Sequence, residues 1–323
     1  MLSRVADSLY WMTRYLERAA NTATIVGVHF NLELEQPRDS GRGRWERIFR
    51  ALHQDAAGVD TLSTDAAVHR LCFDQSNRGS IVSSIRMARD NARQVREQIS
   101  SEMWENLNRI YHDVRHVDLS DFASSGPDDF LNSIKDGARM FRGVTDSTMN
   151  HGEGWQFIAL GQFLERGVNL AALVDQHFLH FPATSVRPGS GFDSSDYLEW
   201  IGLLKCATAF EAYCKVYTAS IVPERVAEFL LLNETFPHSL RFAADRIETA
   251  LKAVSDLSPS RRANKVLRLA GRLRASLRFA GIEEIFSEGV HRTLTDFVRQ
   301  CGDIHSGIYQ AFITYPIEAA LEA

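Results

Sequence analysis

Hydrophobic residues between positions 5 and 30 recur at spacings of three and four, the period of an α-helix. This seam consists of Val5, Leu9, Met12, Leu16, Ala19, Ala23, Val26 and Phe30. Further apolar residues occupy the other faces of the same segment, namely Tyr10, Trp11, Tyr15, Ile25 and Val28. A helix that is apolar nearly all round is typical of the centre of a bundle. The pattern therefore predicts a long central helix near the N-terminus.

The same periodicity recurs along the rest of the chain and predicts further helices. We expect them over residues 81–99, 101–117, 133–147, 152–180, 196–219, 224–233, 239–254, 260–280 and 289–314. Alternating strand patterns do not occur. The prediction is an all-α fold, a large helical bundle of about ten or more helices.

One helical segment occurs twice. YLERAANTATIVGVHF (15–30) reappears 148 residues later as FLERGVNLAALVDQHF (163–178), and each copy is followed by a Gly-, Ser- and Pro-rich segment, 37–43 and 184–195. The identical positions are Leu16/Leu164, Glu17/Glu165, Arg18/Arg166, Asn21/Asn169, Ala23/Ala171, Val26/Val174, His29/His177 and Phe30/Phe178. A second echo at an offset of 155 matches Ser84/Ser239, Arg86/Arg241, Ala88/Ala243 and Asp90/Asp245. We expect a single domain, residues 1–323, built from two duplicated halves (about 1–149 and 150–318) with pseudo-twofold symmetry.

The repeated segment carries a polar stripe that could form a site. At helical spacing, the stripe in the first copy is Arg14, Glu17 and Asn21, with Arg18 beside it; the second copy has Gln162, Glu165 and Asn169, with Arg166 beside it. If these helices are central, the charges must be paired, because an unpaired buried charge costs several kcal/mol. Three interpretations remain open: a buried network that fixes helix register, a ligand pocket between the halves, and surface decoration.

In the pocket interpretation, Glu17 and Glu165 are candidate catalytic general bases, provided that partial burial raises their pKa toward neutrality. The remaining residues of the stripe are candidate ligand-binding groups. His29 and His177 lie farther along the same helices and are interpreted as capping or core residues. We expect no metal site, since paired Glu-x-x-His motifs and clustered cysteines do not occur.

Two other segments are strongly basic. SIRMARDNARQVRE places Arg86 and Arg93 at helical spacing with Arg89 and Arg96, either as an ion-paired flank or as part of a ligand-binding anion site. RRANKVLRLAGRLRASLR has no acidic residue, and Arg261, Lys265, Arg268 and Arg272 form one stripe. Because this stripe lacks internal charge compensation, it is a candidate partner-docking face as well as a simply solvated one.

Composition narrows the class of protein. The chain has 323 residues, 45% hydrophobic and 24% charged, which excludes a disordered protein. A net charge of −5 gives no overall attraction to nucleic acid or anionic membrane. The N-terminal segment lacks the pattern of a secretory signal, and no run of apolar residues is long enough to span a bilayer. Four cysteines without CxxC spacing are typical of free thiols. We expect a cytoplasmic protein that binds neither nucleic acid nor membrane.

Four ordered blocks resemble a known family, and they cover nearly the whole chain: MLSRVADSLYWMTRYLERAANTA, SIRMARDNARQVREQISSEMWENLN, LGQFLERGVNLAALVD and FLLLNETFPHSLRFAADRIE. They are similar to the signature blocks of the alpha-E family, a bacterial all-helical family named for its Glu-Arg motif. Thr24 and Gln162 stand where the family commonly has Arg, so a role that requires Arg at those positions does not carry over.

The resemblance implies a context. Alpha-E proteins occur beside, or fused to, circularly permuted ATP-grasp proteins, often with a transglutaminase-like protein nearby. ATP-grasp enzymes activate a carboxylate as an acyl phosphate and transfer it to an amine or thiol. This chain has no nucleotide-binding motif, so ATP would bind the partner and we expect no cofactor here.

The resulting hypothesis is an accessory or substrate-handling component of an ATP-grasp-dependent amide or peptide bond-forming system, with a Glu/Arg/Asn pocket. Two alternatives remain, a free-standing enzyme acting on a peptide or amino-acid derivative with a Glu general base and a non-catalytic helical adaptor. Whether the chain is itself an enzyme stays open.

Overall fold

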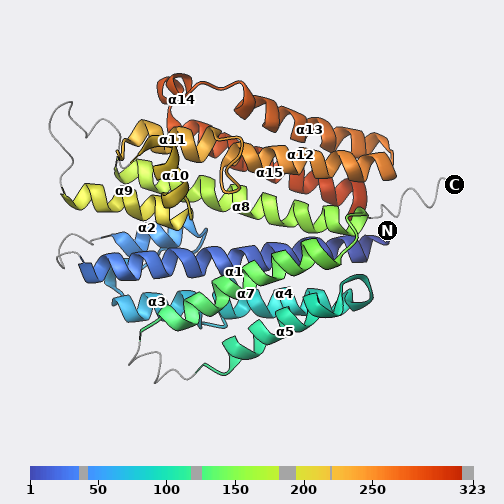
Figure 1. The fold of residues 1–323 in the computed structure, drawn as a ribbon, viewed down its shortest axis with the longest axis horizontal. Coiled ribbons are helices and arrows are strands. Elements are labelled where there is room, and N and C mark those ends of the chain that lie inside the picture. Colours follow the sequence, from blue (N-terminus) through green and yellow to red (C-terminus); the bar gives the residue numbers. More distant parts are fainter. Residues whose placement is uncertain (36–42, 118–125, 182–193, 219, 315–323) are drawn as a thin grey trace.

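The computed structural model describes residues 1–35, 43–117, 126–181, 194–218 and 220–314, and every regular element in these ranges is a helix. The all-α prediction is confirmed. The segments 37–43 and 184–195 lie for the most part outside the described residues. Figure 1 shows the long helices lying roughly side by side along the longest dimension of the molecule.

Two long helices form the centre of the bundle, α1 (Ser3–Glu35) and α8 (Glu153–His180). They pack against each other along much of their length, between the other helices (Figure 1). The hydrophobic seam of the first helix is buried, with Leu9, Ala23 and Val26 at 0% exposure. The central position that the sequence pattern predicts for both helices is therefore confirmed.

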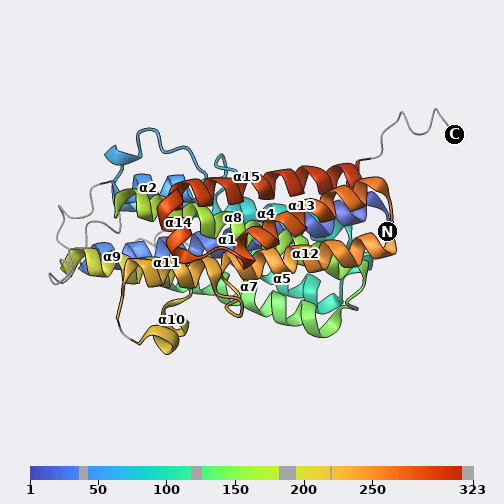
Figure 2. The ribbon, with the colours of Figure 1, turned by 90° about the horizontal axis from the view of Figure 1, so that it is seen from above.

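Each central helix has its own set of packed neighbours. Helix α1 packs against α4 (Ile81–Gln94) and α7 (Asp128–Thr148), and α5 (Ser101–Arg115) covers that pair. On the opposite side of the centre, α8 packs against α12 (Leu240–Leu257) and α15 (Val290–Ile308), and α13 (Arg261–Arg278) covers them. Figure 1 shows these two sets on either side of the α1–α8 pair, and Figure 2 shows the bundle from the side of α12 and α13.

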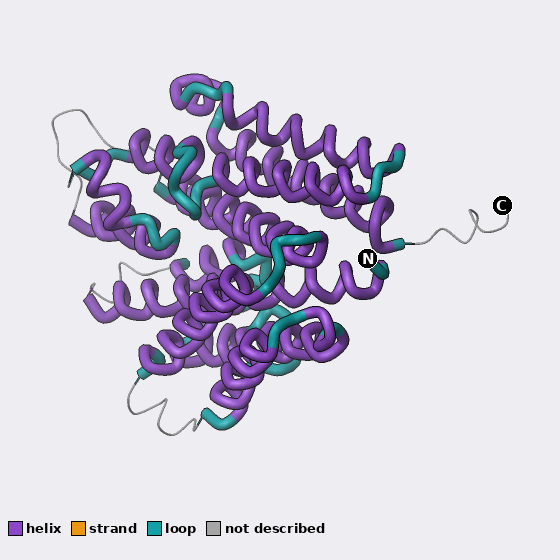
Figure 3. Tube along the Cα trace, turned by 45° about the vertical axis from the view of Figure 1, so that its right-hand side comes forward, coloured by secondary structure: helices purple, strands orange, loops and turns teal. Residues whose placement is uncertain are grey.

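Shorter helices lie toward the left-hand end of the bundle in Figure 1, and Figure 3 shows that helices and loops make up the described residues. They are α2 (Arg44–Ala51), α3 (Thr64–Cys72), α9 (Ser194–Cys206), α10 (Phe210–Tyr217), α11 (Pro223–Leu232) and α14 (Ile282–Glu288). Two of them contact the central helix that they do not directly follow in the chain: α2, which follows α1, contacts α8, and α9, which follows α8, contacts α1. Short 3-10 turns at Val59–Thr61 and Arg96–Gln98 and a π-helix at Tyr309–Ile313 complete the described elements.

Three predicted helices are interrupted or end early, and a fourth, expected over 133–147, begins at Asp128. The helix expected over 196–219 is two helices, because the chain turns at Thr208, whose φ of 51° is left-handed. The helix expected over 81–99 ends at Gln94 and continues as a 3-10 turn. The segment expected as one helix over 289–314 changes to a π-helix at Tyr309.

The serines of the second echo do not occupy the same position in their helices. Ser239 is the N-cap of α12 and accepts a hydrogen bond from the Phe242 N–H, whereas Ser84 lies inside α4. The N-cap of α4 is Ser80, which accepts from the Ser83 N–H. Ser84 therefore lies about one helical turn beyond the position in α4 that corresponds to Ser239 in α12.

The close approach of α1 and α8 depends on Gly161. A Cβ at this position would lie 2.2 Å from the Tyr10 carbonyl oxygen and 2.4 Å from Thr13 Oγ1. Thr13 Oγ1 also donates to the Ile158 carbonyl across the helix pair, at 3.0 Å. Only a residue without a side chain fits between the two backbones here.

We expect Gly161→Ala to lower the free energy of unfolding by about 1–3 kcal/mol, the usual cost of overpacking a core. Gly143 on α7 is the matched control, since a Cβ there would meet no atom within 4 Å. Gly143→Ala should instead raise stability by about 0.4–1 kcal/mol, because alanine restricts the unfolded chain. Urea denaturation of both variants gives the comparison, and equal stabilisation by the two substitutions would contradict the close approach.

Helix α8 is long and apolar enough to cross a membrane, with a mean hydropathy of 1.3 over its most apolar window. In the structure, however, 78% of that window is buried by the other helices. A central core helix has this composition for the same reason that a membrane span does: its surroundings are apolar on nearly every side.

Candidate functional site

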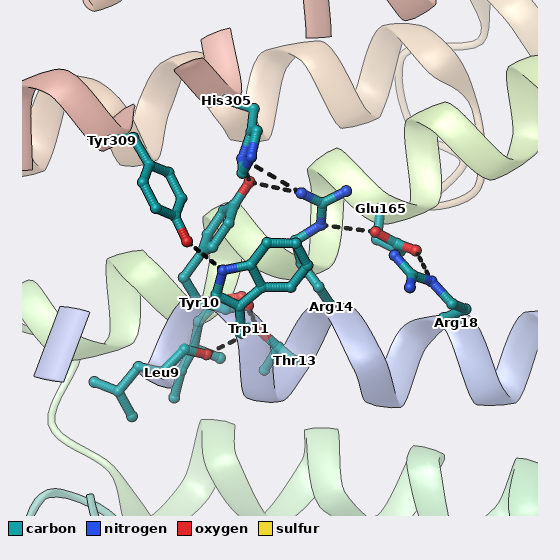
Figure 4. Close-up of polar contacts among 10 residues, drawn as sticks. Leu9, Tyr10, Trp11, Thr13, Arg14, Arg18, Glu165, His305 and Tyr309 are labelled. Atoms are coloured by element: carbon teal, nitrogen blue, oxygen red, sulfur yellow. Dashed lines mark hydrogen bonds and ion pairs between the residues drawn. The ribbon is translucent and has the colours of Figure 1, made fainter. Parts of the chain in front are cut away.

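The carboxylate of Glu165 is the first of two buried acids between α1 and α8. It is 3% exposed and accepts hydrogen bonds from two arginines of α1. Arg14 Nε donates to Oε2 and Arg18 Nε donates to Oε1, each at 2.7 Å (Figure 4). One carboxylate thus holds two guanidinium groups, and the cluster of three side chains keeps one surplus positive charge.

Glu17 forms the corresponding cluster on the other side of the helix pair. Its carboxylate accepts from Arg166 Nε at 2.7 Å and from Arg142 NH1 at 2.9 Å. Arg166 makes a second contact with Glu17 through NH2, at 3.3 Å, and donates through NH1 to the Pro237 carbonyl at 3.0 Å. Again two arginines share one carboxylate.

The two repeated Glu-Arg motifs therefore exchange partners. Glu17 of the first motif binds Arg166 of the second, and Glu165 of the second binds Arg18 of the first. The expectation that the charges of both motifs are paired if the helices are central is confirmed for both glutamates. The sequence did not reveal Arg142, because α7 carries no repeated motif and its contact with Glu17 depends on tertiary packing alone.

These pairings decide the protonation state of both acids. Burial alone would raise the pKa of Glu17, but the charges of Arg166 and Arg142 outweigh it and lower the pKa to about 2. The pKa of Glu165 is also lowered, because Arg14 and Arg18 outweigh its burial. A general base works best with a pKa near the operating pH. The condition on which both glutamates were candidate bases, a raised pKa, is not met.

Arg14 connects the Glu165 cluster to an aromatic group on α1 and α15 (Figure 4). Its NH1 donates to Tyr10 Oη at 3.2 Å, and its guanidinium lies over the Trp11 ring, 4.7 Å from the centroid. Tyr10 Oη and His305 Nδ1 are 2.8 Å apart. Trp11 Nε1 donates to the Tyr309 hydroxyl, which donates to Asp7. These contacts hold Arg14 in one orientation.

A broad polar cleft opens at the Glu165 cluster. Its volume is about 710 Å³. Arg14, Arg18, Glu165 and Asn169 line one side, and the loops that precede α3 and α4 line the other, contributing His53, Gln54, Asp55, Asp74, Ser76, Asn77 and Arg78. Arg18 is 28% exposed, so part of its guanidinium faces the cleft. We call this the α4-side cleft.

A smaller pocket, of about 110 Å³, lies at the Glu17 cluster and is lined by Glu17, Asn21, Arg166 and Asn169 together with α7 residues. We call it the α7-side pocket. The sequence suggested one pocket shared by both motifs; the structure divides the candidate residues between two, and only Asn169 lines both. An apolar pocket of about 230 Å³ adjoins the smaller one through Glu17 and Arg142.

His29 and His177 belong to a separate buried region. The pKa of His29 is lowered to about 3 by burial and by the nearby charges of Arg44 and Arg47. His177 packs edge-on against Trp200, with ring centroids 4.4 Å apart. Their position agrees with the interpretation as core residues. The same region contains a buried ion pair that the sequence did not reveal, Arg44 NH2 to Glu199 Oε1 at 2.7 Å.

Two groups of candidate residues lie away from these clusters. Arg86 and Arg93 are exposed on α4, and Arg86 lines a separate surface pocket with Tyr111 and Arg115. The α13 stripe, Arg261, Lys265, Arg268 and Arg272, is exposed along its length. Within the described part of the chain, none of these six residues forms an ion pair, and no group of three His, Cys, Asp or Glu side chains could hold a metal ion.

Comparison with known proteins finds a family model that matches this chain and that has a conserved Glu-Arg motif. The model of the Alpha-E family, described as a predicted alpha-helical domain with a conserved ER motif, matches residues 1–313. Uncharacterized proteins of Mycobacterium bovis and Mycobacterium tuberculosis are each 25% identical over 317 residues, covering 91% of this chain. The chain spans only 35% of the length of these relatives. No solved structure matches it.

Proposed function

Because the chain belongs to the Alpha-E family, we propose that it is a substrate-handling component of an ATP-grasp-dependent system that forms amide or peptide bonds. In this proposal the ATP-grasp protein binds ATP and activates a carboxylate. The present chain holds the substrate in the α4-side cleft. The observation that carries the proposal is the surplus of arginine at Glu165, where two guanidinium groups share one carboxylate at the edge of a polar cleft.

The chemistry of this cleft favours an anionic or zwitterionic ligand. Arg14 and Arg18 each use Nε for Glu165, and the aromatic contacts of Arg14 fix its plane. The NH groups of Arg18 that face the cleft remain available to a substrate carboxylate, and guanidinium binds carboxylate with two parallel hydrogen bonds. On the opposite wall, Asp55 and Asp74 offer carboxylate acceptors to a substrate amine, beside the compensating charges of Arg70 and Arg78.

The two alternatives are less well supported. A free-standing enzyme with a glutamate base conflicts with the lowered pKa of Glu17 and Glu165. A purely structural adaptor would explain Arg166, whose donors are used by Glu17 and Pro237, but it would not require the open cleft at Arg18. We therefore place binding ahead of both.

A duplicated origin of the two halves, 1–149 and 150–318 of a single domain, is part of the same proposal. Two pairs of local features support it. His53 and Thr208 are both left-handed, with φ of 54° and 51°, and each follows a helix by the same pair of backbone hydrogen bonds. Asp74 and Asn233 each accept from the N–H two residues later, ahead of the capping serines of α4 and α12. Gene duplication would explain why each cluster faces a similar pair of loops.

The exposed stripe on α13 is the proposed docking face for the partner, a circularly permuted ATP-grasp protein, or for its anionic substrate; a transglutaminase-like protein is a further candidate partner. The relatives are nearly three times as long as this chain, which leaves room for such a partner within one polypeptide. Helix α13 buries Val266, Ala270 and Leu273 and exposes its basic side, so the stripe faces solvent.

We expect the ATP-grasp partner from the same organism to co-purify with the wild-type chain at low salt and less at high salt, because exposed charges are screened over about 8 Å at physiological ionic strength. Replacing the four stripe residues, Arg261, Lys265, Arg268 and Arg272, by Glu should abolish recovery. Arg86→Glu/Arg93→Glu on α4 is the control and should retain the partner. Equal recovery with every variant and salt concentration would rule out this face.

A further inference from the structure

The α7-side pocket is rich in cationic side chains and takes no part in the ligand binding proposed for the α4-side cleft. Four cationic side chains line it, Lys135, Arg139, Arg142 and Arg166, and they meet one carboxylate, that of Glu17. Arg142 and Arg166 bind this carboxylate. Arg139 forms an ion pair, at 2.7 Å, with Asp136, which does not line the pocket. Lys135 forms no ion pair within the described residues, so the pocket keeps a positive charge that its own acids do not neutralise.

The surroundings of Lys135 disfavour its charged form. Its pKa is lowered by burial and by the charge of Arg139, which outweigh the nearby Asp128 and Asp136. Arg142 has a lowered pKa for similar reasons, burial first and the charge of Arg166 among the others. An anion placed between these side chains would relieve the repulsion, because it would interact favourably with every one of them.

Two amides supply a second and independent indication of a ligand. Asn169 is 6% exposed and lines the pocket, yet its Nδ2 has no hydrogen-bond partner among the described residues. Asn21, on the facing helix α1, is half-buried, and its Nδ2 atom is likewise buried without a hydrogen-bond partner among the described residues. Buried N–H donors without an acceptor are rare and cost about 1–3 kcal/mol each. An oxyanion offers the acceptors that both amides lack.

The size of the pocket limits the ligand. A volume of about 110 Å³ exceeds the minimum for one water several-fold, so a compact group of a few heavy atoms fits. We propose that the α7-side pocket binds a tetrahedral oxyanion, either free phosphate or the phosphoryl group of an ester, between Lys135, Arg142 and the amides of Asn21 and Asn169. The apolar pocket beside it, lined by Trp155 and Phe163, would receive the remainder of an ester.

This site is independent of the proposed function of the α4-side cleft. The two share Asn169 but no charged residue. A variant that removes charge from one of them therefore leaves the other intact, and the two proposals can fail separately.

Isothermal titration calorimetry with inorganic phosphate, at constant ionic strength, tests the inference. Wild type should bind one equivalent saturably, and Lys135→Gln should weaken the affinity at least about tenfold, since one opposite charge is lost next to the anion. Lys135→Gln breaks no ion pair, so the fold is retained. Lys215→Gln, which changes an exposed lysine of α10 outside both pockets, is the control and should bind phosphate as wild type does.

Three further ligands test which kind of anion the α7-side pocket binds. Sulfate should compete with phosphate, whereas acetate at the same concentration should not, because a planar carboxylate presents fewer oxygens to the four donors. Phenyl phosphate that binds more tightly than phosphate indicates an ester as ligand, and equal affinity indicates the free ion. Absence of saturable phosphate binding by wild type, or equal loss of affinity in Lys135→Gln and Lys215→Gln, would overturn the proposal.

Discussion

Replacing Glu17 by alanine is expected to lower the free energy of unfolding by about 3–5 kcal/mol, the usual cost of breaking a buried ion pair. The variant leaves Arg166, which is 7% exposed, without its carboxylate and with only the Pro237 carbonyl as an acceptor. Arg142 loses the same partner. Urea denaturation at neutral pH measures the difference. Glu46→Ala, which removes an exposed pair with Arg50, is the control and should cost less than about 0.5 kcal/mol.

The pH dependence of this difference identifies its cause. The pKa of Glu17 is about 2 in the folded protein and close to its ordinary value of 4.5 in the unfolded chain. Stabilisation by this carboxylate is therefore complete above pH 4.5 and is lost as the pH falls toward 2, when the folded protein takes up the proton. The gap between wild type and Glu17→Ala should narrow over that range. A gap that stays constant down to pH 2 would mean that packing, and not charge, is responsible.

The central helices could be predicted from sequence because their signal is local. A helix that is apolar on nearly every face is buried, and this pattern occurs twice in the chain. Charges that recur inside two buried helices must be paired. The predicted burial of Glu17 and Glu165 rested on this reasoning alone. Which arginine pairs with which glutamate depends on how α1 and α8 cross. Gly161 sets the distance between the two backbones, and this contact belongs to the tertiary structure.

The division into two pockets could not be predicted for a related reason. Both motifs lie on neighbouring helices, so a single pocket between them was the simplest interpretation. In the structure the glutamates exchange arginines across the helix pair, which fills the space between them and leaves openings on opposite sides. Arg142 and Lys135 of α7 complete one opening, and neither carries a sequence signal, since isolated basic residues are common on exposed helix faces.

The effect of Arg18→Gln on ATP turnover by the reconstituted system shows whether the arginines around Glu165 serve a ligand as well as the fold. Arg14 still pairs with Glu165 in this variant, so the melting temperature should stay close to that of wild type. A lost charge-assisted hydrogen bond to substrate, about 1.5–3 kcal/mol, should lower the rate by about tenfold or more.

The rate is the ADP released by the ATP-grasp partner in the presence of the chain and a small-molecule extract of the host cell. Arg4→Gln is the matched control, because Arg4 is an exposed arginine of the same helix that forms no ion pair in the described structure. We expect wild type and Arg4→Gln to stimulate ADP release equally, and Arg18→Gln, folded and stable, to lose this stimulation. Full stimulation by Arg18→Gln, or none by wild type, would contradict a role of Arg18 in ligand binding.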